Sequence, residues 1–302
     1  MLDLSQPIWR VDVAGSTRPA QVYLAPTLDG LLAPYALRTP SDEGVFPFVF
    51  LAYGNGGYGV EWLESRLATH GYIMERLLAA GYACAWGCYR TEVELGFHRG
   101  GPLVTDQRSG MGLMNRAPLE YEDELAILRH VGSLDGIDAD RLGHLGVSHA
   151  GEMLFKLASH YPGVLRAGIA VEPANHEFLD LSPDQAPAEE RAFRNVEEMQ
   201  MHDTSRVRAR SNVPLALERL SPLDLPILVV GRDDDHLQGI FRLSYELLIE
   251  GGHDAAWVSW PHPDHGFVFP ERRPDSEPAC DDIQDRAISH MIAFFDQHLR
   301  SS

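Results

Sequence analysis

The chain has 302 residues, of which 44% are hydrophobic, and it carries a formal net charge of −19. This length can bury a large core in one domain, so we expect a single domain over residues 1–302. The acidic balance argues against a general binder of phosphate backbones, and we therefore expect no nucleic-acid partner.

Three cysteines, Cys84, Cys88 and Cys280, give an odd count, and two of them lie in one apolar run. This pattern favours buried thiols in a reducing compartment over a disulfide framework. No pair of cysteines is matched by histidines at zinc spacing, so we expect no metal and no cofactor. The N-terminus lacks a basic start with an apolar core, and no run is long enough to cross a bilayer. We therefore expect a cytoplasmic protein without a membrane partner.

The first elements along the chain are predicted to be strands. The runs Ala20 to Leu24 and Leu31 to Arg38 flank a turn at Gly30, which predicts a hairpin of edge strands. Pro34 argues against a central place for the second strand. The continuous apolar run from Phe46 to Tyr53 predicts a strand that is covered on both faces.

A glycine-rich loop, YGNGGYG, follows this strand. Glycine lets backbone amides approach a ligand closely, so an N–H near Asn55 or Gly56 could help to hold an oxyanion. A flexible turn and a phosphate-binding loop are the alternatives. The phosphate-binding loop ranks last because no Lys-Ser or Lys-Thr follows the glycines.

Helical spacing from Trp62 to Ala80, followed by an apolar run from Tyr82 to Cys88, predicts a parallel crossover unit. Periodicity is lost from Arg90 to Pro118, which fits either the rim of an active site or a solvated loop. Helical spacing resumes from Leu119 to Val131.

A strand then turns directly into a helix at a serine. Gly146, Ser148 and Ala150 occupy the three marked positions of the pattern Gly-x-Ser-x-Gly, and Gly151 comes one step later. Such a nucleophile elbow exposes the serine hydroxyl at the carboxyl edge of a sheet. It also directs the backbone N–H of His149 toward the atom that the hydroxyl attacks.

The strand that follows, Leu165 to Glu172, ends in a carboxylate that could recognise a polar substrate group, as could Arg99. Composition shifts between residues 173 and 220, where a charged, weakly amphipathic stretch predicts a helical cap or lid insertion. A solvated surface excursion is the alternative. The remaining predicted elements are a strand at 224–231, a helix at 238–250, a strand at 255–260 and an amphipathic helix at 282–299.

The partners that an elbow serine needs follow later strands. A serine hydroxyl requires a base within hydrogen-bond reach and a carboxylate that orients this base. Asp234 lies three residues after the glycine that ends DLPILVVG, and His265 lies in the loop after the last strand. The order Ser, Asp, His is the α/β-hydrolase order. The rival acids are Asp233 and Asp235, and the rival base is His262.

The motifs YGNGGYG, GYACAWGCYR, GVSHAG, PILVVGRDDDH and PHPDHGF resemble the prolyl-oligopeptidase-like and dienelactone-hydrolase-like branches of the α/β-hydrolase superfamily. The resemblance covers about residues 29–299. It implies an α/β-hydrolase fold, with a mostly parallel central sheet and helices on both faces. It also implies that Ser148 is the nucleophile, Asp234 the acid and His265 the base. Fewer than fifty residues precede the first core strand, so we expect no N-terminal propeller.

These features together predict a serine hydrolase that cleaves a small-molecule carboxylic ester through an acyl-enzyme at Ser148. Two alternatives remain open. One is a peptidase or acylaminoacyl hydrolase with the same three residues, and the other is a binding protein without catalysis on the same scaffold. The sequence also leaves a homo-oligomer open.

Overall fold

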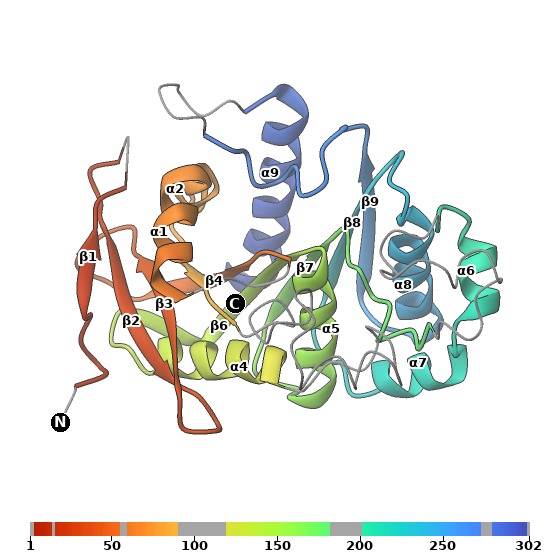
Figure 1. The fold of residues 1–302 in the computed structure, drawn as a ribbon, viewed down its shortest axis with the longest axis horizontal. Helices are drawn as coiled ribbons and strands as arrows, with labels where there is room; N and C mark the ends of the chain where they lie inside the picture. Colours follow the sequence, from red (N-terminus) through yellow and green to blue (C-terminus); the bar gives the residue numbers. More distant parts are fainter. Residues whose placement is uncertain are drawn as a thin grey trace, which may run out of the picture.

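A nine-stranded sheet runs through the part of the molecule that the structure describes (Figure 1). The computed structural model describes residues 3–13, 16–54, 59–89, 119–181, 201–272 and 280–300. The strand order is β1-β2-β3-β5-β4-β6-β7-β8-β9. The pairs β1/β2, β2/β3 and β3/β5 are antiparallel, and every pair from β5/β4 to β8/β9 is parallel. The sheet is therefore mostly parallel, as the sequence predicts.

Four strands come first along the chain, and helices alternate with strands from β4 onward. The strands are β1 (Trp9–Val11), β2 (Ala20–Pro26), β3 (Leu32–Arg38), β4 (Phe46–Ala52), β5 (Ala83–Gly87), β6 (Ile137–Val147), β7 (Ala167–Val171), β8 (Ile227–Arg232) and β9 (Ala255–Trp260). The helices are α1 (Gly59–Thr69), α2 (Gly71–Ala79), α4 (Leu119–Gly132), α5 (His149–His160), α6 (Thr204–Arg210), α7 (Val213–Leu220), α8 (Gln238–Glu250) and α9 (Asp282–Phe295), which continues as the π-helical turn η5 (Asp296–Arg300).

Two hydrophobic cores lie on opposite faces of the sheet. Successive side chains of a strand point to opposite faces, and β4 shows the consequence. Phe48 and Phe50 pack with α4, α5 and α8, whereas Val49 and Leu51 pack with α1, α2 and α9. The two groups of helices are separated by the sheet in Figure 1. Helices on both faces explain why the central strands read as continuous apolar runs.

The prediction that β2 and β3 form an edge hairpin is wrong in one respect. The hairpin exists, but β1 pairs with β2, and β3 pairs with β5 on its other side. The ladder between β3 and β5 begins only at Tyr35, so the missing N–H of Pro34 falls outside it. The Pro34 carbonyl still accepts a hydrogen bond from the Cys88 N–H at 3.1 Å. A proline therefore fits at the start of an interior strand.

The helix predicted from Trp62 to Ala80 is two helices, α1 and α2, which meet at His70 and Gly71. A Cβ on Gly71 would lie only 3.2 Å from Val13 Cγ1, so the chain passes close to the N-terminal segment at this point. Side-chain periodicity continues across the break, which is why the sequence pattern does not reveal it.

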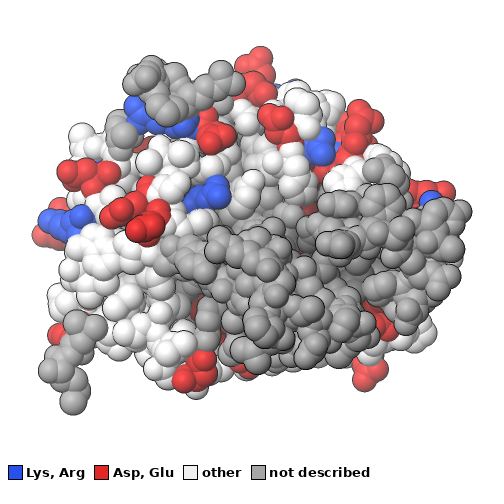
Figure 2. All heavy atoms as spheres, viewed as in Figure 1, with Lys and Arg blue, Asp and Glu red and all other residues white. Residues whose placement is uncertain are grey.

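The region predicted as a cap contains α6 and α7, both of which pack beside α8. Residues 182–200 of this region, and the predicted rim loop at 90–118, lie outside the described residues. The role of residues 173–220 as a lid stays a prediction. Among the described residues, no helix is long and apolar enough to span a membrane. Acidic side chains are scattered over the described part of the face in Figure 2, in keeping with the net charge of −19.

Candidate active site

The serine of the predicted elbow lies between β6 and α5 and has a left-handed backbone conformation. Ser148 has φ 60° and ψ −121°, a combination that residues other than glycine rarely adopt. The Ser148 N–H donates to the Val171 carbonyl at 2.8 Å, and the Ser148 carbonyl accepts from the N–H groups of Gly151 and Ala174. These bonds fix the strained turn from both sides, as a nucleophile elbow requires.

The small residues around the serine explain how the variant elbow GVSHAG packs. A Cβ on Gly146 would lie 2.3 Å from the Ala150 carbonyl oxygen, so only glycine lets the strand and the helix approach this closely. Ala150 is fully buried in that contact. A Cβ on Gly151 would lie 2.9 Å from the Pro173 Cα. Glycine is therefore needed at 146 and 151, whereas position 150 holds a fully buried alanine.

Gly54, which follows β4, leaves room for the serine. A Cβ there would lie 2.9 Å from Ser148 Cβ and 3.3 Å from Ser148 Oγ. The predicted oxyanion donors Asn55 and Gly56 lie outside the described residues. The third predicted donor, the N–H of His149, is at the first position of α5, where a backbone N–H has no intrahelical partner.

His265 lies in the loop after β9, at the same edge of the sheet. The turn depends on Gly266, whose φ of 76° favours glycine. A Cβ on Gly266 would lie 3.4 Å from Val147 Cγ1, so the residue after His265 contacts the residue before Ser148. Within the described part of the chain, no hydrogen bond joins the Ser148 hydroxyl to His265.

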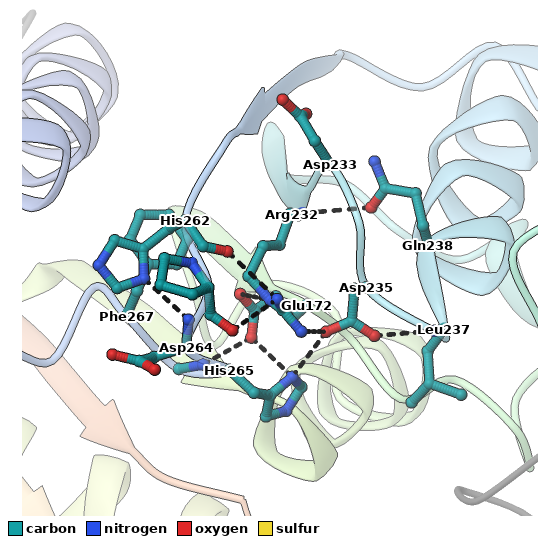
Figure 3. A network of polar contacts seen from close by, with 12 residues as sticks. Glu172, Arg232, Asp233, Asp235, Leu237, Gln238, His262, Asp264, His265 and Phe267 are labelled. Carbon is teal, nitrogen blue, oxygen red and sulfur yellow. Dashed lines mark hydrogen bonds and ion pairs between the residues drawn. The ribbon is translucent and has the colours of Figure 1, made fainter.

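The carboxylate beside His265 is that of Asp235, so the predicted pairing with Asp234 is wrong (Figure 3). His265 Nδ1 lies 3.0 Å from Asp235 Oδ2, and Asp235 is fully buried, whereas Asp234 is exposed. The prediction takes Gly231 as the last residue of the strand. In the structure β8 stays paired with β9 through Arg232. The residue three positions after the end of the strand is therefore Asp235.

A second buried carboxylate contacts the same imidazole nitrogen. Glu172 directly follows β7, and its Oε2 lies 2.8 Å from His265 Nδ1. The sequence shows Glu172 as a charged residue at the end of a buried strand, but it gives no reason to expect this contact. Only the alignment of the carboxyl ends of β7 and β8 brings Glu172 and Asp235 together (Figure 3).

Arg232 connects the two carboxylates to the histidine loop. Its Nη2 donates to Asp235 Oδ2 at 2.6 Å, and its Nε lies 3.6 Å from Glu172 Oε1. Its Nη1 donates to the carbonyl oxygens of His262 and Pro263 at 3.1 and 2.8 Å. The planar, multiply donating guanidinium suits such a bridge, which a lysine could not reproduce.

This arrangement favours a protonated imidazole. Burial lowers the pKa of His265, but the hydrogen bonds and charges of Asp235 and Glu172 outweigh it and raise that pKa to about 10. Burial works in the opposite sense on Asp235. Hydrogen bonds from His265, from the Leu237 N–H and from Arg232 nevertheless hold the pKa of Asp235 well below its usual range.

Other predicted site residues have separate partners. The rival base His262 is buried, lies 3.1 Å from Asp281 and stacks on Phe267. The side chain of His149 is buried, with Nε2 2.8 Å from Glu120. The rival acid Asp233 accepts a hydrogen bond from Ser259.

Ligand atoms of Glu172, Asp235 and His265 all lie within 4.8 Å of one another, a spacing that a metal ion could use. The donor set fits an ion poorly, because the guanidinium of Arg232 contacts both carboxylates and holds a fixed positive charge beside them. We expect these groups to act on one another rather than to bind a metal.

No protein-family model and no curated protein matches this chain. Solved structures do match it. The hyperthermophilic esterase of the archaeon Pyrobaculum calidifontis is 18% identical with a TM-score of 0.59, over 92% of this chain and 85% of its own. An esterase of the fungus Rhizomucor miehei is 16% identical with a TM-score of 0.61, over 96% and 86%.

Dipeptidyl peptidase 4 of Porphyromonas gingivalis is 17% identical with a TM-score of 0.57 over 93% of this chain, which spans only 36% of that enzyme. These neighbours are members of the α/β-hydrolase superfamily. At such low identity the likeness establishes the fold alone. The chain has the α/β-hydrolase fold, as its motifs predict.

Proposed function

We propose that the protein is a serine hydrolase that cleaves a carboxylic ester through an acyl-enzyme at Ser148. The observation that carries the proposal is the pairing of two features at one sheet edge. One is a serine with positive φ at a strand-to-helix turn, and the other is a histidine whose Nδ1 contacts a buried carboxylate. Esterases among the structural neighbours support the ester as the substrate bond.

In the proposed first half-reaction, Nε2 of His265 takes the Ser148 proton while Oγ attacks the ester carbonyl carbon. Asp235 holds Nδ1 protonated and stabilises the imidazolium that forms. The hydrogen bond from Ser148 to His265 would form with substrate bound, since such bonds often tighten only in the complex. The charge on the carbonyl oxygen is held by the N–H of His149 and, as the sequence predicts, by an N–H at Asn55 or Gly56.

The imidazolium then gives its proton to the departing alkoxide, and an alcohol leaves, which completes the acyl-enzyme and ends the first half-reaction. A water then enters, His265 takes its proton, and the hydroxide oxygen attacks the acyl carbon. Collapse of this intermediate returns the proton to Oγ of Ser148 and releases the carboxylic acid. The cycle consumes one water and needs no cofactor.

The same residues could cleave an amide, and the match to a dipeptidyl peptidase favours a peptide or acylaminoacyl substrate as the second candidate. Rates on nitrophenyl esters and aminoacyl anilides, measured side by side, separate the two. A binding protein without catalysis is the third candidate, and it predicts that Ser148 stays unlabelled by a fluorophosphonate.

The decisive test compares the wild type with Ser148→Ala. We expect the variant to lose about a thousandfold or more in ester turnover and to lose fluorophosphonate labelling, because the residual rate comes only from binding and the oxyanion hole. Equal turnover by the two proteins would refute the proposal. Ser159→Ala is a matched control, since Ser159 is at the far end of the same helix and donates to the Arg219 carbonyl.

A further inference from the structure

The imidazole of His265 contacts two carboxylates, whereas a catalytic triad requires only one. Its Nδ1 carries one proton, yet Glu172 Oε2 lies 2.8 Å away and Asp235 Oδ2 lies 3.0 Å away. Both carboxylates are fully buried. One carboxylate is enough to orient the histidine of a triad, so the second needs its own explanation.

The backbone holds Glu172 in place for this contact. Its φ is 47°, a left-handed conformation that costs a non-glycine residue on the order of 1–3 kcal/mol. Its N–H donates to the Val230 carbonyl at 2.7 Å, and its Oε2 accepts from the Gly266 N–H at 2.6 Å. The chain therefore turns sharply after β7 in a way that directs this carboxylate at the histidine loop.

The charges of the four ion-paired residues Glu172, Asp235, Arg232 and His265 balance only when the imidazole is protonated. Asp235 and Glu172 supply two negative charges, and Arg232 supplies one positive charge between them. Among the described residues, further titratable groups nearby include His236, with Nδ1 3.3 Å from Asp235 Oδ1, Tyr53, whose hydroxyl lies near Gly266, and the exposed Asp264, which precedes His265. An imidazolium completes the neutral set, so the site is built to stabilise that ion.

We propose that Glu172 is a second acidic positioning residue, which shares the Nδ1 proton of His265 with Asp235. The inference rests on the proposed serine hydrolase function. Either carboxylate then suffices to keep Nδ1 protonated and Nε2 directed at Ser148, and both stabilise the imidazolium formed during attack. Activity should persist when one acid is neutralised and should collapse when both are.

A second consequence concerns pH. Only a neutral imidazole can accept the serine proton, so activity rises as His265 loses its proton. The pKa of His265 is raised to about 10, despite burial, by its contacts with Asp235 and Glu172. The activity of the wild type should therefore still increase between about pH 8 and pH 10, well above the ordinary titration range of histidine at about 6.5.

The test measures kcat/KM for a nitrophenyl ester from pH 5 to 10.5 in Glu172→Gln, Asp235→Asn and the double variant. Asp234→Asn is the control, because it removes an exposed charge next to Asp235. The activity limb is the part of the pH profile in which kcat/KM rises as His265 loses its proton. Glu172→Gln should lower the pKa of this limb by about one unit or more, since a close opposite charge shifts a pKa by roughly that much. The control should leave the limb in place.

On the plateau above the limb, obtained by fitting each pH profile, Asp235→Asn should lose about 10- to 100-fold. The double variant should lose about 10⁴-fold, which is the loss expected when a triad has no acid left. An unmoved limb in Glu172→Gln, or an Asp235→Asn variant as inactive as the double variant, overturns the proposal. Activity that survives Ser148→Ala would instead overturn the hydrolase mechanism, so the two failures are distinguishable.

Glutamine keeps an oxygen that can accept from the Gly266 N–H, which favours folding of the variant. A readout independent of activity is the NMR titration of His265 in a Ser148→Ala background, where Glu172→Gln should lower the pKa of the imidazole by the same amount. If Glu172→Gln fails to fold, Asp235→Asn decides alone. A loss in Asp235→Asn equal to that of His265→Gln would overturn the proposal.

Discussion

Gly54→Ala tests whether the space around Ser148 controls catalysis. The new Cβ would lie 2.9 Å from Ser148 Cβ and 3.3 Å from both Ser148 Oγ and the Val147 carbonyl oxygen. Ordinary contacts at a Cβ begin near 3.4 Å, so the two segments must separate by about half an ångström. Neither side is a flexible side chain that could swing away.

The displacement must affect the nucleophile or its surroundings. Ser148 is held by its N–H bond to Val171 and by the bonds that its carbonyl accepts from Gly151 and Ala174. Gly54, on the other side, leads into the predicted oxyanion loop. A misplacement of about 1 Å can cost about 100-fold, so half of that distance predicts a loss of about 10-fold in kcat/KM. Overpacking should cost the fold about 1–3 kcal/mol.

The assay combines kcat/KM on a nitrophenyl ester, the rate of fluorophosphonate labelling and urea unfolding. Gly132→Ala is the matched control, since its new Cβ would meet its nearest neighbour, Ala139 Cβ, at an ordinary 3.6 Å. We expect the control to keep its activity. A Gly54→Ala variant with unchanged kcat/KM and an unchanged labelling rate would refute the assignment of Ser148 as the nucleophile at a sterically fixed turn.

Two further predictions concern stability. The contacts of His265 with Asp235 and Glu172 raise its pKa to about 10. The stability that these contacts contribute is therefore full below about pH 6.5 and is lost as the pH rises through 10. The free energy of unfolding of the wild type, measured in urea, should fall as the pH rises through this window. If the free energies of wild type and His265→Gln changed in parallel with pH, the reasoning would be contradicted. Separately, His144 Nε2 and Glu124 Oε2 form a fully buried pair at 3.0 Å. His144→Leu or Glu124→Leu alone should lower the free energy of unfolding by about 3–5 kcal/mol, because each leaves a buried charged or polar partner unpaired. The double variant should lose much less. Losses in urea unfolding that simply add in the double variant would exclude this coupling.

Local sequence patterns sufficed for the central elements. The boundaries of α8 and β9 are those expected from periodicity, because both elements end at glycine or proline signals that act within a few residues. The elbow at Ser148 was also readable, since the requirement for glycine at 146 is a contact between residues only four positions apart. Local chemistry of this kind is fully encoded in a short stretch of chain.

Long-range pairing was not readable in the same way. The choice between Asp234 and Asp235 depended on whether Arg232 continues the ladder with β9, a contact across 28 positions of sequence. The place of β3 inside the sheet likewise depended on pairing with β5, which is distant in sequence. A pattern read along one strand contains no information about its neighbour on the other side.

The sequence alone therefore determined the alternation of strands and helices, the turn that presents Ser148 and the loop that carries His265. Only the tertiary structure decided which carboxylates reach the imidazole. Glu172 and Asp235 are 63 positions apart, and they meet because β7 and β8 are parallel neighbours whose carboxyl ends share one edge. Charge at a strand end is visible in a sequence, but its partner is fixed only when the strands pair.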